Sequence, residues 1–265
     1  MRSRGTCCLL AAVWLVSGVI FQNAAAAISE RTFHRVLDLA ERIYTGEFLA
    51  RDLRLQLQRY WKSDAHRASA SQQEDRQGRI AVVSISGGIA RDAIITRDAF
   101  ALIVCHEIGH HLAGPPQQSG FSAEGQADYF AASECLRRLL PLMPDYAATA
   151  MHPVPRRLDH QCSTAFQDDD EAYLCLRIAV AGEVLSRYLA RRGGWHDPDF
   201  RTPDPTVATK TRFAPATPQY RLDTYRAAAL CNPDANLDAA PRTRWLCGHP
   251  VPHPEAVRPA CWYRG

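Results

Sequence analysis

Two short motifs constrain this chain more than any other feature: HEIGH at residues 106–110 and EGQAD at residues 124–128. In each motif, two side chains that can bind a metal ion or a proton stand four residues apart. On an α-helix such residues lie on the same face, one turn apart. Thr96 can cap a helix through the first motif, and Ser122 can cap a helix through the second. The motifs therefore predict two neighbouring helices with polar side chains between them.

The first motif has the composition of a metal-binding helix. His106 and His110 can both reach one cation, and zinc favours such nitrogen ligands. If the two helices pack antiparallel, Glu124 comes level with His110 and completes a set of three ligands for one Zn²⁺ per chain. Asp128 then comes level with His106, where its carboxylate can accept the imidazole N–H and fix the tautomer.

Glu107 lies beside the fourth position of that site, which a catalytic zinc centre leaves open. There its carboxylate can take a proton from water and deliver it to a leaving amine. A five-residue pattern with three fixed positions occurs by chance in roughly one chain in a hundred of this length, so HEIGH alone is weak evidence. Its place within a predicted helix, and its register with EGQAD, favour a true site.

Simpler alternatives exist for each residue. The two histidines can be semi-buried structural residues, and Glu124 can be a first-turn carboxylate that interacts with the helix dipole. Asp128 can be a plain surface charge. At the level of function, the alternatives are a zinc-containing scaffold that binds proteins without cutting them and a metal-free module held by disulfides. The intact Glu107 favours an enzyme, because a scaffold needs no base.

HEIGH followed by EGQAD resembles the gluzincin zinc metallopeptidases, and the pattern is most similar to that of the HtpX and CAAX prenyl endopeptidase family. The preceding stretch IAVVSISGGIARDAIITRDAFALIVCHEIGHH also fits this family. The resemblance implies a zincin-like fold, with Glu107 as general base, Asp128 behind the ligands, and a metal held by His106, His110 and Glu124. It also implies that residues 80–85 form an edge strand that pairs with extended substrate.

The chain departs from that family in three ways. The family's membrane-spanning helices are absent, and the gap between the two motifs is shorter than usual. The family also has a histidine, followed six residues later by an arginine, that helps to stabilise the oxyanion. Here Pro215 stands at the histidine position and Arg221 at the arginine position. Arg221, Tyr225 and His196 are candidate transition-state stabilisers, although each residue type is more often structural.

The first 27 residues have the pattern of a secretory signal. Arg2 and Arg4 precede an apolar run at residues 9–21, and residues 24–27 offer a small-residue cleavage site. The run is short for a membrane span, and an uncleaved anchor is the alternative. Without the two arginines the formal net charge falls from +3 to +1, which gives no reason to expect nucleic acid as a partner. We expect an exported protein, periplasmic or secreted, with no integral membrane segment after cleavage and with a protein or peptide substrate.

The cysteines support export, because most should pair in an oxidising compartment. Nine become seven once Cys7 and Cys8 leave with the signal. Cys105 is the expected free thiol, since apolar residues flank it in the predicted metal helix. Along ideal helices its level differs by about 9 Å from that of Cys135, which excludes a bridge between them. Three bridges of open connectivity are expected among Cys135, Cys162, Cys175, Cys231, Cys247 and Cys261.

The hydrophobic periodicity predicts an α+β fold, mostly helical, with a small antiparallel sheet and the two motif helices as a pair. Three parts of the chain are expected: a signal peptide at 1–27, a metallopeptidase domain at 28–194, and a Pro-rich, disulfide-held C-terminal segment at 195–265 that packs on the same domain. The expected elements are a helical stretch at 29–61 that Gly46 breaks or bends, with a second helical piece at 48–61, helices at 96–112, 123–140, 168–192 and 221–230, a strand at 80–85, a loop at 62–78 and an irregular segment at 195–220.

Overall fold

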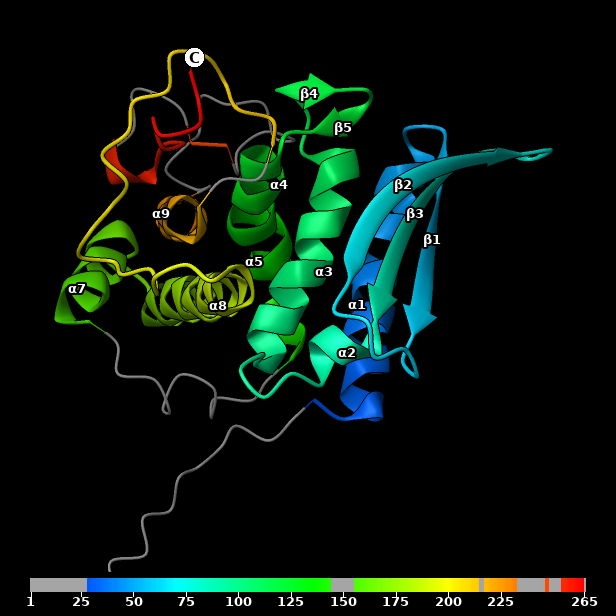
Figure 1. Cartoon of the computed structure of the whole chain (residues 1–265), viewed down its shortest axis with the longest axis horizontal. Helices are drawn as coiled ribbons and strands as arrows, with labels where there is room; N and C mark the ends of the chain where they lie inside the picture. The colour runs from blue at the N-terminus through cyan, green and yellow to red at the C-terminus, as the bar shows by residue number, and fades with distance from the viewer. Residues whose placement is uncertain (1–27, 144–154, 215–216, 233–245, 248–253, 265) are drawn as a thin grey trace, which may run out of the picture.

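A computed structural model describes residues 28–143, 155–214, 217–232, 246–247 and 254–264 of the chain (Figure 1). The predicted signal peptide and Pro215 lie outside these residues. The predicted α+β class, mostly helical with small sheets, is confirmed. The elements are α1 (Glu30–Leu49), β1 (Leu53–Tyr60), β2 (Ala68–Asp75), β3 (Gly78–Ser86), α2 (Gly87–Ala90), α3 (Arg97–Leu112), β4 (Gln117–Gln118), β5 (Phe121–Ser122), α4 (Glu124–Phe130), the π-helical turn η1 (Ala131–Cys135), α5 (Leu136–Leu139), the 3₁₀ turn η2 (Leu140–Leu142), α7 (Arg156–Ala165), α8 (Asp169–Gly193), α9 (Pro218–Ala229) and the 3₁₀ turn η5 (Pro254–Ala256).

The main sheet has the strand order β1–β3–β2 and is mixed, so the expectation of an antiparallel sheet was wrong for one of its two strand pairs. β1 runs parallel to β3, with Leu57 opposite Val83, and β2 runs antiparallel to β3, with Ala70 opposite Val83. The strand predicted at residues 80–85 is confirmed within β3. It is the central strand and not the edge that the resemblance implied, because β2 covers it.

Two predictions for the chain before that strand were wrong. The first helical piece is confirmed as α1, which ends at Leu49, but the second piece expected at 48–61 is replaced by β1. Leu53, Leu55 and Leu57 alternate with polar residues, which is the period of a strand and not of a helix. The loop expected at 62–78 contains β2, whose last five residues are polar and exposed. β2 forms because its backbone pairs with β3. Its sequence could not predict a strand, because large apolar and polar side chains do not alternate along it.

The long helix α8 begins and ends where the sequence predicts. The Asp168 carboxylate accepts the N–H groups of Asp170 and Glu171, both at 3.0 Å, and Gly194 ends the helix in the left-handed conformation with a φ of 68°. α8 packs against both α3 and α9 (Figure 1). At the start of α3, Asp98 forms a buried two-pronged ion pair with Arg177 of α8, with both N–O distances at 3.0 Å.

Among the described residues after 194, those of α9 pack on α8 and α4. The segment at 195–214 is irregular, as predicted, and the Ala208 and Arg212 N–H groups donate to the carbonyls of Ala260 and Trp262 at 2.8 and 2.9 Å. The last predicted helix is confirmed as α9, which Thr217 caps three residues earlier than expected. α7 was not predicted. Within the described residues, no helix is both long enough and apolar enough to cross a bilayer.

The cysteine pairing corrects the expectation for Cys105. Cys105 is bonded to Cys135, with their Cα atoms 5.5 Å apart, and among the described cysteines the free thiol is the buried Cys261. The other two bridges join α7 to α8 and the end of α9 to the tail. They are Cys162–Cys175 and Cys231–Cys247.

The wrong exclusion of the Cys105–Cys135 bridge came from the assumed helix register. The two backbones approach closely at Gly109 and Ala127. From that contact, Cys105 lies about 6 Å along α3, and Cys135 lies about 12 Å along an ideal α-helix. The offset is therefore about 6 Å. The π-helical turn that ends at Cys135 packs more residues into each turn and reduces it further.

Non-reducing peptide mapping by mass spectrometry tests this pairing. We expect three linked peptide pairs and a single alkylatable thiol, Cys261, that reacts only after unfolding because it is buried. Alkylation of Cys105 in the native protein would contradict the structure.

The Asp98–Arg177 pair should be essential for stability. Asp98→Ala leaves the buried Arg177 charge without its partner, so the free energy of unfolding should fall by about 3–5 kcal/mol in chemical denaturation. The matched control is Asp75→Ala, which removes an exposed ion pair with Arg54 and one hydrogen bond from the Gln77 N–H, and it should lower the free energy of unfolding by no more than about 1 kcal/mol. Equal midpoints for the two variants would contradict this role.

Candidate metal centre

The two motifs meet because α3 and α4 lie side by side with closely spaced backbones (Figure 1). A Cβ atom at Gly109 would lie 2.9 Å from the Ala127 carbonyl oxygen, so only glycine permits this approach without a shift. α3 starts at the predicted cap, where the Thr96 hydroxyl accepts the Ala99 N–H at 3.2 Å. The predicted cap of α4 was wrong, because Ala123 occupies that position with no side-chain bond.

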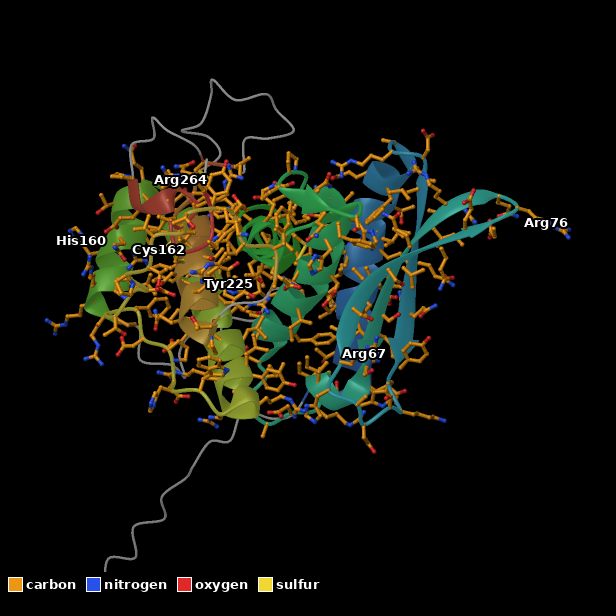
Figure 2. All side chains as sticks on the ribbon, turned by 45° about the horizontal axis from the view of Figure 1, so that its top comes forward. Arg67, Arg76, His160, Cys162, Tyr225 and Arg264 are labelled. Atoms are coloured by element: carbon orange, nitrogen blue, oxygen red, sulfur yellow. A yellow bond between two sulfur atoms is a disulfide. The ribbon has the colours of Figure 1, made fainter. Side chains whose placement is uncertain are left out.

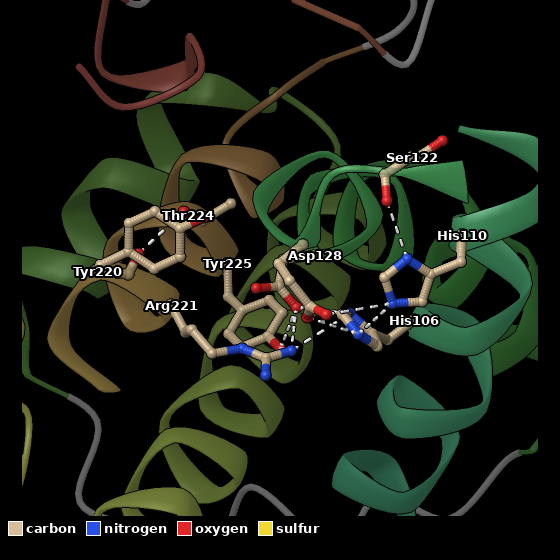
Figure 3. A network of polar contacts seen from close by, with 9 residues as sticks. His106, His110, Ser122, Asp128, Tyr220, Arg221, Thr224 and Tyr225 are labelled. Carbon is tan, nitrogen blue, oxygen red and sulfur yellow. Dashed lines mark hydrogen bonds and ion pairs between the residues drawn. The ribbon is translucent and has the colours of Figure 1, made fainter. Parts of the chain in front are cut away.

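The hydrogen bonds of the two histidines define their tautomers (Figure 3). His106 Nδ1 lies 2.7 Å from Asp128 Oδ1, and His110 Nδ1 lies 2.9 Å from the Ser122 carbonyl oxygen. Both oxygens are acceptors at neutral pH, so both Nδ1 atoms carry a hydrogen. Both Nε2 atoms are therefore the positions at which a cation would bind. The Ser122 hydroxyl instead donates to the Gly114 carbonyl at 2.8 Å.

The potential ligand atoms converge on one point. The two Nε2 atoms are 3.1 Å apart, and the Glu124 carboxylate oxygens lie 3.3 Å from His106 Nε2 and 3.7 Å from His110 Nε2. Ligands at about 2.0–2.1 Å from a tetrahedral zinc ion stand about 3.3 Å from one another. The three predicted ligands thus have the spacing of a metal site, and His106, His110 and Glu124 could hold a metal ion.

Asp128 holds His106 in place, as the sequence predicts, and α9 adds two partners that the sequence does not pair with it. Asp128 Oδ1 accepts the Tyr225 hydroxyl at 2.6 Å and the Arg221 guanidinium as well as the imidazole N–H (Figure 3). Tyr225 stands one turn after Arg221, so both reach the same carboxylate. Three donors compensate for the complete burial of this charge.

Of the three candidate stabilisers, only Arg221 lines the cleft beside the metal ligands. Its guanidinium lies 3.2 Å from His106 Nδ1, the ring nitrogen that does not face the metal position. Tyr225 is fully buried behind Asp128, and His196 is exposed away from the cleft. The structure therefore places Arg221 and Tyr225 as residues that hold the Asp128–His106 pair.

The charges of the site are strongly coupled. Burial lowers the pKa of His106, but the Asp128 carboxylate outweighs it and raises that pKa to about 10. Burial lowers the pKa of His110 to about 4. Burial raises the pKa values of Glu124 and Asp128, but hydrogen bonds and charges from His106 and Arg221 outweigh it and bring both to about 2. A cation that binds Nε2 of His106 must displace the proton there.

Glu107 lies at the base of a cleft of about 710 Å³ that also exposes the ligands. Burial raises the pKa of the Glu107 carboxyl to about 7, which suits proton exchange near neutral pH. The walls of the cleft are the start of β2, the β4–β5 hairpin, the end of α8 and Phe213. The sequence did not point to these walls, since they come from segments that carry no motif.

Comparison of the chain with protein-family models, with curated proteins and with solved structures found no match.

Metal affinity, measured by competition with a chromophoric chelator, tests the site. His106→Ala, His110→Ala and Glu124→Ala should each abolish stoichiometric zinc binding, because two ligands remain. Asp128→Asn should weaken binding about 10–100-fold, since it keeps all three ligands but disturbs the support of His106. His160→Ala removes an exposed imidazole on α7 and serves as the control (Figure 2). Unchanged affinity in the three ligand variants would exclude the site.

Proposed function

We propose that this protein is a zinc-dependent endopeptidase that hydrolyses peptide bonds in proteins of the cell envelope or exterior. The observation that carries the proposal is the position of Glu107, buried at the base of an open cleft beside three converging ligands. Two imidazoles and one carboxylate form a typical ligand set of catalytic zinc. The resemblance of HEIGH and EGQAD to the gluzincins agrees with this activity.

The proposed chemistry divides between the metal and Glu107. When bound, zinc would polarise the substrate carbonyl and make the attacking water more acidic. Glu107 accepts one proton from that water while the water oxygen forms a bond to the carbonyl carbon. The C–N bond then breaks, and Glu107 returns the proton to the departing nitrogen, so that the products are a carboxylic acid and an amine. Burial raises the pKa of the Glu107 carboxyl, which makes this carboxylate a better proton acceptor.

The chain itself can orient an extended substrate. β2 is an edge strand, and its first residues, Ala68, Ser69 and Ala70, line the cleft opposite the ligands. An edge strand offers unpaired backbone groups to which a peptide can add as a further strand. The small side chains leave room for such a peptide. β2 therefore takes the role that the resemblance assigns to residues 80–85.

The position of Arg221 gives it a supporting role in this reaction. Its guanidinium bonds to Asp128 and fixes His106, while the same residue faces the cleft. Stabilisation of the oxyanion would thus come mainly from the metal, with Arg221 as the nearby cation on the chain. Three disulfides fit an exported protein, and we place the enzyme in the periplasm or outside the cell.

Substitution of Glu107 tests the activity. Glu107→Gln should keep zinc binding but lower kcat/KM on a denatured protein substrate about 10²–10⁴-fold, because it removes only the base. The matched control, Glu74→Gln, changes an exposed carboxylate of the β2–β3 hairpin and should keep full activity. Wild-type protein that holds one zinc ion and cuts no peptide would instead support a non-cleaving scaffold.

A further inference from the structure

One end of the cleft is basic and takes no part in the proposed chemistry. His66 and Arg67 immediately precede β2, and Tyr188 and Arg192 lie in the last turns of α8; all four residues line the cleft. Figure 2 shows Arg67 at the base of the β2–β3 hairpin, near α2, and Arg76 at the opposite end, the hairpin tip. The basic end of the cleft, where Arg67 lies, is near α2 and the start of α3 (Figures 1 and 2).

Tyr188 joins the two walls at this end. Its ring stacks on His66, with centroids 6.2 Å apart at 16°, and its hydroxyl lies 3.0 Å from His66 Nδ1. The Arg192 guanidinium lies 5.9 Å from the centre of the same ring. The cleft is thus bounded here by an aromatic bridge, with one arginine on each wall.

No described carboxylate neutralises either guanidinium. Among the described residues, Arg67 and Arg192 have no ion pair and no side-chain hydrogen bond, whereas nearby Arg91 is paired with Asp64. Asp92 lies 3.7 Å from His66 Nδ1 and also accepts the Ile94 N–H. The only carboxylates that line the cleft belong to the metal site, Glu107 and Glu124. This end of the cleft therefore carries excess positive charge.

We propose that Arg67 and Arg192 bind a carboxylate of the substrate and so determine cleavage specificity, an inference that rests on the proposed peptidase function. Arginines presented toward a cleft attract and orient an anionic ligand. Ile89, Ile103 and Leu185 line the same cleft, so an apolar substrate residue would fit beside the bound carboxylate. The carboxylate is either an Asp or Glu side chain or the free C-terminus of the peptide.

Matched peptide pairs distinguish these sources. One series of synthetic octapeptides carries Glu or Gln at a single position, and a second series has a free acid or a carboxamide at the C-terminus. Wild-type enzyme should cleave the charged member of one series with kcat/KM about tenfold higher, and the series that responds identifies the carboxylate. Because the two arginines are exposed, added salt should reduce the preference.

The arginine variants test the assignment. Arg67→Gln and Arg192→Gln should each lower the preference about 2- to 5-fold, and the double variant should abolish it while it still cleaves the neutral peptides. The matched controls are Arg76→Gln and Arg191→Gln, exposed arginines outside the cleft lining, which should keep the wild-type preference.

Two results would overturn the proposal: equal cleavage of charged and neutral peptides by the wild type, or an unchanged preference in the double variant. Both outcomes leave the peptidase function intact. If the zinc-loaded wild type cleaves no peptide in either series, the proposed function itself fails, and this inference fails with it.

Discussion

The close contact between α3 and α4 at Gly109 and Ala127 is the constraint on which the rest of the site depends. It brings His106 within 2.7 Å of Asp128 and lets the Glu124 carboxylate reach both imidazoles. The adjoining disulfide between α3 and η1 covalently joins the same two segments. Any change that separates these backbones would move the ligands of one helix away from those of the other.

Burial of Asp128 links the metal ligands to α9. A fully buried carboxylate needs several donors, and α9 supplies two of them through Arg221 and Tyr225. α9 in turn packs on α8, whose last turns form one wall of the cleft. α9 is therefore part of the site, and its removal would leave Asp128 without two of its three donors.

Local spacing made the site predictable, whereas packing made the remainder hard to predict. The five motif residues stand four apart or adjacent on helices, so their convergence follows from helix geometry. The cleft wall at 68–75 has a polar sequence and is a strand only because β3 pairs with it. The Cys105–Cys135 bridge depends on a π-helical turn and a glycine contact. The role of Arg221 depends on where a distant helix lies.

The central claim is that three side chains of α3 and α4 bind one zinc ion. Anomalous diffraction at the zinc absorption edge, from crystals of the natively purified protein, tests it directly. We expect one strong peak per chain, about 2.0–2.2 Å from the Nε2 atoms of His106 and His110 and from a carboxylate oxygen of Glu124. The absence of a peak there, or a peak with other ligands, would contradict the account.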